Sequence, residues 1–103
     1  MAFWNLNTLR LEAFRPGILS KAEIGDNLIM VVMEIEAEKE DTGHSHKHDQ
    51  CGIVLDGNIE MFIGEERTIL TSHESYFIPS GMQHGWKTFD NSVKLLDVSM
   101  KSS

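Results

Sequence analysis

The sequence predicts an all-β domain built around a single core. Turn-forming residues recur about every eight to twelve positions, a spacing typical of antiparallel sandwiches and barrels, and helical periodicity is scarce. Residues 28–38 alternate between two kinds of side chain, which is the pattern of a strand buried on one face. The apolar positions of that strand are Ile29, Val31, Met33, Ile35 and Ala37, and the acidic ones are Glu34, Glu36 and Glu38.

Size, composition and charge exclude several classes of protein. A chain of 103 residues, 41% of them hydrophobic and 24% charged, is expected to form one ordinary globular domain. The longest apolar run, 28–33, is far too short to cross a bilayer. The net charge is −7 with only nine Lys and Arg, so no basic surface for nucleic acid is expected. The N-terminus carries no export signal, and a cytoplasmic location is expected by default.

The chain divides into an N-terminal segment, 1–24, and a barrel, 25–103. The N-terminal segment is rich in apolar residues without a clean period, so we expect a strand there that packs on the barrel or on a second subunit. An open small barrel leaves edge strands that need to be covered, and the sequence therefore predicts a homodimer.

Strands and turns alternate through the rest of the chain. Residues 38–43 are polar and predict a loop. Residues 56–58, Asp-Gly-Asn, predict a hairpin turn, since Gly and Asn accept a positive φ, and Pro79 ends a strand because it has no amide proton. About eight strands are expected in total, enough for a small barrel that holds one ligand or metal ion. After 28–38 they are expected at 52–55, 59–63, 67–70, 75–78, 84–89 and 93–100.

Histidines mark the candidate chemistry. His44 and His46 are two positions apart, so in a strand both rings would enter the barrel from the same face, and His84 follows much later. Imidazole binds divalent Zn, Fe, Ni, Mn and Cu ions. Three nitrogen ligands that leave open positions describe a reactive site, because a structural site is closed by its protein ligands.

The spacing of these residues resembles the cupin superfamily, in particular its small single-domain members. A first motif contains His44-x-His46, then Gln50 and Gly57, and a second motif contains Pro79-x-Gly81-x-x-His84. The resemblance implies a jelly-roll barrel, also called a double-stranded β-helix, with one divalent metal ion held by four ligands. Carried over position by position, those ligands are His44, His46, Gln50 and His84.

Two positions of the first motif need comment. His48 would also face inward in a regular strand, yet the family pattern makes it a non-ligand, which requires an irregularity between His46 and Gln50. We expect His48 at the rim of the pocket, where it contacts substrate. Gln50 stands where glutamate is more usual, and a neutral amide leaves the charge of the ion uncancelled and the ion more electrophilic.

Other residues are candidates to act beside the metal ion. Asp97 lies in an otherwise apolar strand, where a carboxyl group often has a raised pKa and serves as a catalytic acid or base. An exposed position on an amphipathic strand is the alternative. Tyr76 and Trp86 are candidates to line the pocket and bind substrate, or else they only fill the barrel.

The strand that contains Asp97 also resembles a narrower group, the cupins of pectin and alginate breakdown that open or isomerise unsaturated uronates. Asp97 matches an aspartate that is a catalytic candidate in those proteins, but Ser99 replaces an aromatic residue and no arginine follows before Ser103. The resemblance implies isomerase, ring-opening or lyase chemistry on a small sugar-derived or carbonyl substrate. Two alternatives stay open, a non-catalytic binding or sensor domain and a metal-dependent dioxygenase.

Overall fold

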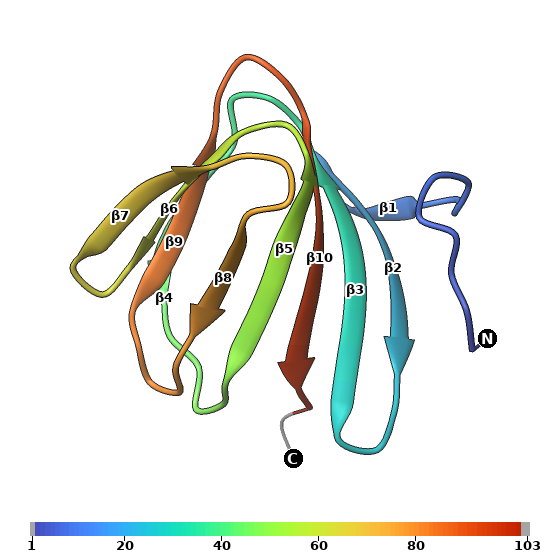
Figure 1. Cartoon of the computed structure of the whole chain (residues 1–103), viewed down its shortest axis with the longest axis horizontal. Helices are drawn as coiled ribbons and strands as arrows, with labels where there is room; N and C mark the ends of the chain where they lie inside the picture. Colours follow the sequence, from blue (N-terminus) through green and yellow to red (C-terminus); the bar gives the residue numbers. More distant parts are fainter. Residues whose placement is uncertain (1, 102–103) are drawn as a thin grey trace.

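The computed structural model describes residues 2–101, and all regular structure in that range is β-strand (Figure 1). Ten strands form two antiparallel sheets, one of six strands in the order β1-β2-β3-β10-β5-β8 and one of four in the order β4-β9-β6-β7. The strands are β1 Glu12–Arg15, β2 Ile18–Ile24, β3 Leu28–Ile35, β4 Glu40–His44, β5 Gln50–Asp56, β6 Ile59–Ile63, β7 Glu66–Leu70, β8 Ser75–Ile78, β9 His84–Thr88 and β10 Val93–Met100. The all-β jelly-roll prediction is confirmed.

Two details of the sequence prediction are wrong. Residues 40–43, which were expected in a loop, form strand β4 together with His44, because this segment pairs with β9 in the smaller sheet. The turn at 56–58 is real, and Gly57 has a φ of 90°, but β5 and β6 do not pair as a hairpin. The chain crosses there from one sheet to the other, since β5 pairs with β10 and β8 while β6 pairs with β9 and β7.

The N-terminal segment contributes a hairpin, β1 and β2, where a single strand was expected. Pro16 and Gly17 make its two-residue turn, for which Pro supplies the first backbone angle and Gly the positive φ, here 82°. Strand β2 pairs along its whole length with β3, so the hairpin extends the larger sheet and β1 becomes its edge. These two additions, β4 and the second N-terminal strand, account for ten strands in place of eight.

The core lies between the two sheets. Its buried members come from both of them: Ile18, Ile35, Val54, Ile59, Met61, Leu70, Tyr76, Ile78, Val93 and Leu95. Burial of these side chains, each of which stabilises the fold by about 1.5–3 kcal/mol, holds the two sheets face to face. No helix within residues 2–101 is long and apolar enough to span a membrane.

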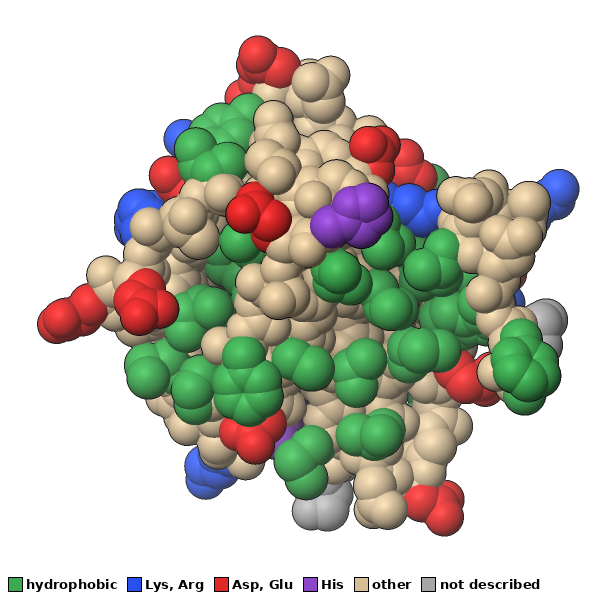
Figure 2. All heavy atoms as spheres, in the orientation of Figure 1, with side chains coloured by type: hydrophobic (Ala, Val, Ile, Leu, Met, Phe, Trp, Pro, Cys, Tyr) green, Lys and Arg blue, Asp and Glu red, His purple; other side chains and the backbone are tan. Residues whose placement is uncertain are grey.

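The outer face of the six-stranded sheet is also apolar (Figure 2). Phe77 and Met100 are 60% and 49% exposed, and Leu28 at the end of β3 is 55% exposed. A shallow hollow on this face is lined mainly by side chains of β5, β8 and β10, among them Cys51, Ile53, Phe77, Leu96 and Val98. The larger sheet therefore presents apolar side chains on both of its faces.

Candidate metal centre

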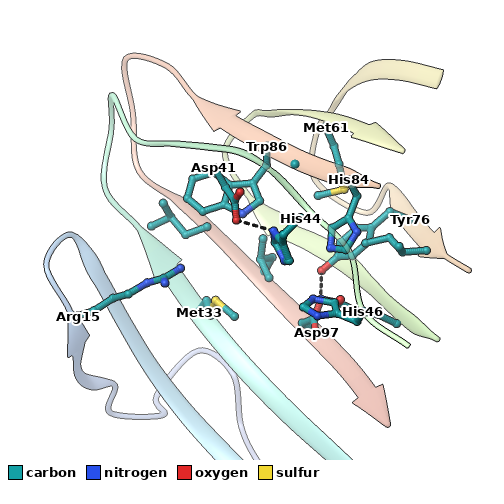
Figure 3. Close-up of a pocket in the computed structure, with 15 residues that line it drawn as sticks. Arg15, Met33, Asp41, His44, His46, Met61, Tyr76, His84, Trp86 and Asp97 are labelled. Atoms are coloured by element: carbon teal, nitrogen blue, oxygen red, sulfur yellow. Dashed lines mark hydrogen bonds and ion pairs between the residues drawn. The ribbon is translucent and has the colours of Figure 1, made fainter. Parts of the chain in front are cut away.

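Three histidines meet at one end of the space between the sheets (Figure 3). His44 ends β4, His84 begins β9, and His46 lies in the irregular segment between β4 and β5. One ring nitrogen from each lies within 4.8 Å of those of the other two. The ring centroids are 4.4 Å apart for His44 and His84, and 4.6 Å apart for His44 and His46. Imidazole nitrogens gathered this closely could hold one divalent ion between them.

A bulge in β4 brings His44 into this group. Asp41 pairs with Trp86 and His44 pairs with His84, so three steps along β4 match two steps along β9. Residues three apart on a regular strand point to opposite faces, but the extra residue turns both Asp41 and His44 into the cavity. Gly43 lies within the bulge with a φ of 136°, and its amide donates to Asp41 Oδ1 at 3.0 Å.

Hydrogen bonds orient two of the imidazole rings. Asp41 Oδ2 lies 3.0 Å from His44 Nδ1, and the carbonyl oxygen of Met82 lies 3.0 Å from His84 Nδ1. Carbonyl and carboxylate oxygens accept, so each Nδ1 carries a proton, and in the neutral tautomer this leaves the lone pair on Nε2. His84 Nε2 is fully buried and has no hydrogen-bond partner in the described part of the chain. A buried nitrogen of this kind fits a metal ligand.

His46 is held in place by its loop. β4 ends at His44 and β5 begins at Gln50, so strand geometry is interrupted between them. The His46 carbonyl oxygen accepts from the amide of Gly81 at 2.6 Å, which ties this loop to the turn that precedes His84. Burial, and then the neighbouring charges of His44 and His84, lower the pKa of His46. The lowered pKa favours the neutral ring that a metal ligand requires.

His48 lies outside the cavity. Its ring stacks on that of His46, with centroids 4.9 Å apart and an interplanar angle of 9°. It is absent from the side chains that line the cavity, so the structure places it behind His46. The irregularity that the family pattern required between His46 and Gln50 is present as the segment 45–49.

A second group of polar side chains comes from the larger sheet. Asp97 is only 5% exposed, and its Oδ2 accepts from Gln50 Nε2 at 2.8 Å and from the Tyr76 hydroxyl at 2.5 Å. Within residues 2–101, no hydrogen bond reaches Asp97 Oδ1. Gln50 Oε1 is buried and likewise has no partner among the described residues, so the amide donates to Asp97 and leaves an oxygen for a metal ion.

The environment controls how these groups ionise. Burial raises the pKa of Asp97, and the hydrogen bonds from Tyr76 and Gln50 only partly oppose that effect. Burial, followed by the negative charge of Asp97, raises the pKa of Tyr76, so its hydroxyl stays protonated and acts as a donor. The pKa of Asp97 moves up toward neutrality while that of Tyr76 moves away from it, so Asp97 is the better suited of the two to exchange a proton.

Gly52 makes the contact between Tyr76 and Asp97 possible. In the larger sheet Gly52 pairs with Tyr76 on one side and with Asp97 on the other, so the three residues lie in one row. A Cβ atom at Gly52 would overlap the Tyr76 hydroxyl and the Leu96 carbonyl oxygen. The missing side chain lets the Tyr76 ring cross β5 and reach the carboxyl group beyond it.

The three histidines and the hydrogen-bonded group around Asp97 line the same cavity, which has a volume of about 200 Å³. Apolar side chains such as Met33, Ile78, Trp86 and Leu95 make up much of the remaining wall. Of the residues expected from the sequence, His44, His46, Gln50, Tyr76, His84, Trp86 and Asp97 line this cavity, and His48 does not. Three further participants were missed, namely Asp41, Gly52 and Arg15.

The missed residues carried little signal in the sequence. Asp41 belongs to an acidic run that is typical of a solvated surface, and only the bulge directs it to His44. A glycine in a strand indicates a close approach by another group, which was a usable signal for Gly52. Arg15 comes from the N-terminal segment, whose position relative to the barrel no local pattern indicates.

An all-β barrel that collects three histidines, an amide and a buried carboxyl group in one cavity belongs to a class of small domains suited to holding a metal ion. The Cupin domain profile matches residues 31–99, which is more than half of the chain. The chain therefore belongs to the cupin family. No curated protein sequence gave a match.

Solved structures of the same fold include KdgF from Halomonas sp., with a TM-score of 0.85 and 22% identity over 100% of this chain and 96% of that one. An RmlC-like cupin from Shewanella frigidimarina has a TM-score of 0.84 and 20% identity over 99% and 92%. The polyketide cyclase RemF from Streptomyces resistomycificus has a TM-score of 0.81 and 19% identity over 97% and 79%. At these identities the similarity establishes the fold.

Proposed function

We propose that this cupin is a metal-dependent enzyme that isomerises, opens or cleaves a small sugar-derived or carbonyl substrate. The observation that carries the proposal is the single cavity shared by the three histidines and by Asp97, a buried carboxyl group with one oxygen free of hydrogen bonds from the described residues. A domain that only binds a ligand has no need of a carboxyl group kept buried at such a cost in solvation.

The ligands in this proposal are His44, His46, His84 and Gln50. Three neutral imidazoles and one amide suit a divalent Zn, Fe, Ni, Mn or Cu ion, and their donor atoms leave room for substrate. A bound ion of this type polarises a carbonyl or hydroxyl group of the substrate. Gln50 also contacts Asp97, so a glutamate at this position would place two carboxylates side by side.

Asp97 is the acid or base of the reaction. Its Oδ2 is held by Gln50 and Tyr76, which fixes the carboxyl group and leaves Oδ1 to take a proton from a substrate carbon or hydroxyl and return it to another atom. Tyr76 positions Asp97 and stays protonated throughout. Trp86 and Met33 provide apolar walls that limit water around the reacting atoms.

Structural relatives support an enzymatic role for the fold. One is named as a polyketide cyclase, and another structure, with a TM-score of 0.74, is described as a DMSP lyase. The strand around Asp97 resembles the uronate-converting cupins, which favours a uronate or keto-sugar as substrate. The cupin fold hosts many activities, so the assignment depends on the cavity and its residues.

A test compares two aspartate variants of protein purified without a histidine tag. Elemental analysis is expected to find about one divalent ion per chain. Asp97→Asn is expected to keep the ion and to lose on the order of 10²–10⁴-fold of turnover on an unsaturated uronate or keto-sugar, the usual contribution of a general acid or base. Asp90→Asn, on an exposed turn, is the matched control and is expected to match the wild type. Equal turnover by Asp97→Asn and the wild type would contradict the proposal.

We also propose that the chain forms a homodimer. The apolar outer face of the larger sheet supports this, because a two-fold pair would cover the same exposed residues on both copies. Phe77→Lys is expected to shift sedimentation from dimer to monomer. Ile69→Lys places the same charge at a 53% exposed position of the other sheet and is expected to stay dimeric. A wild-type monomer at micromolar concentration would refute dimerisation.

A further inference from the structure

Arg15 lines the cavity of the candidate metal centre although it comes from the N-terminal hairpin. Figure 3 shows its side chain extending from β1 toward the cavity, beside Met33. It is the only Lys or Arg among the side chains that line this cavity. Within residues 2–101 its guanidinium makes no ion pair, and its one recorded contact is with the ring of Phe14, 5.6 Å from the centroid.

The hairpin holds Arg15 in a defined place. Arg15 pairs with Ile18 across the two-residue turn, and Ile18 is 5% exposed in the core. The carbonyl oxygen of Gly17 accepts from the amide of Glu36 at 2.9 Å, which joins the tip of the hairpin to the end of β3. The guanidinium therefore extends from a backbone that is fixed on both sides of the turn.

Within residues 2–101, the acidic groups around the cavity make no ion pair with Arg15. Asp41 is engaged by His44 and Gly43, and Asp97 is engaged by Gln50 and Tyr76. Glu34 and Glu36 share a neighbouring surface hollow with Arg15, but Glu36 lies 4.0 Å from the ammonium of Lys39. A guanidinium presents a planar set of donors that matches a carboxylate in a bidentate arrangement.

We propose that Arg15 is the carboxylate-binding residue of the cavity, and that the ligand is a small sugar acid or keto acid. The carboxylate lies against Arg15 at the mouth, and the reacting carbonyl or hydroxyl end lies against the histidines and Asp97. This inference rests on the proposed function and narrows its substrate to an anion. It assigns to the N-terminal hairpin the role of a substrate-recognition element.

A binding experiment uses two probes that differ in charge, galacturonate and its methyl ester, with the protein in its metal-containing form. Calorimetric titration of Arg15→Gln is expected to show at least tenfold weaker binding of galacturonate and unchanged binding of the ester. Arg15→Lys is expected to fall between, because an ammonium keeps the charge but loses the bidentate geometry. Arg10→Gln removes the same charge from an exposed residue that lines none of the hollows described above, and is expected to bind as the wild type does.

Unchanged galacturonate binding by Arg15→Gln would overturn the assignment, as would equal weakening by Arg10→Gln. Wild-type protein that binds neither probe, or binds the ester as tightly as the acid, would also overturn it. Metal content and the turnover loss in Asp97→Asn test the proposed function separately, so either proposal can fail while the other stands. In turnover assays, Arg15→Gln is expected to raise KM about tenfold or more and to leave kcat within a few-fold.

Discussion

The polar groups on the two sides of the cavity differ in the hydrogen bonds that they make within the protein. On the side of the four-stranded sheet, His44 and His84 have their Nδ1 atoms bonded to Asp41 and to the Met82 carbonyl oxygen, which leaves their Nε2 atoms for a metal ion. On the side of the six-stranded sheet, Asp97 accepts from two donors, Gln50 on the adjacent strand β5 and Tyr76 on β8 beyond it. The histidine side is arranged to receive a metal ion, whereas on the other side one oxygen of Asp97 is already held by two internal donors.

This difference indicates that the two sides of the cavity have different functions. Open, oriented nitrogens favour metal binding, while a fixed and buried carboxyl group favours proton transfer. Gln50 joins the two sides, because its nitrogen donates to Asp97 and its buried oxygen has no partner among the described residues. Variants on the histidine side should therefore change metal content first, and variants on the carboxyl side should change turnover with the metal retained.

The largest effect is expected for His46→Ala. Loss of one of three imidazole ligands should reduce the metal content of purified protein to less than about a tenth of the wild-type value, since two rings and the neutral amide of Gln50 bind the ion too weakly. His48→Ala is the matched control, because His48 stacks on His46 but lies outside the cavity. Elemental analysis of both proteins is the measurement. Equal metal loss in the two variants would contradict the assignment of ligands.

Gln50→Glu tests the residue that connects the two sides. A carboxylate at this position should bind the ion more tightly, but it removes the donor to Asp97 Oδ2 and adds a like charge beside it. We expect turnover to fall by about 10–100-fold. A decrease of this size corresponds to the loss of one hydrogen bond to a charged group, which contributes about 1.5–3 kcal/mol. Competition with a chelator and steady-state kinetics would measure the two effects. Weaker metal binding would remove Gln50 from the ligand set.

Asp41→Asn tests the partner of His44. The substitution removes the charge that orients the ring through Nδ1, and comparable changes in the partners of metal-bound histidines lower metal affinity by about 10–100-fold. Titration with a metal-buffered series would give the affinity, with Asp90→Asn as the control. An unchanged affinity would show that the bulge alone positions His44.

Gly52→Ala tests the carboxyl side with the smallest change in mass. The added methyl group would displace the Tyr76 hydroxyl, so Tyr76 can no longer hold Asp97. Turnover should fall by about tenfold, which corresponds to about 1.4 kcal/mol, and overpacking should lower the free energy of unfolding by about 1–3 kcal/mol. Tyr76→Phe removes the same hydrogen bond without a clash and should show the turnover loss. Metal content should stay at the wild-type level in both.

Much of the fold could be predicted because each strand carries its own local signal. Alternation in 28–38 marked β3, although the strand ends at Ile35. Pro79 ended β8 at Ile78, and Gly57 marked a true turn. The failures have physical causes. A turn residue indicates that the chain changes direction, but it does not indicate whether the strands before and after the turn pair with each other. The sequence prediction therefore wrongly paired β5 with β6. Strand β4 has no apolar alternation that could mark it in the sequence, and it is recognised as a strand only by its pairing with β9.

The sequence by itself determined the all-β class, the two spaced motifs and the set of histidines, because residue type and spacing are local properties. The tertiary structure alone decided what those residues contact. Gln50 is 47 positions from Asp97, and Tyr76 is 21 positions from it. Asp41 faces the cavity only through a bulge, and Arg15 reaches it only because a hairpin adds to the sheet edge. Long-range pairing and local irregularity of this kind depend on the packing of the whole barrel, which no single stretch of sequence encodes.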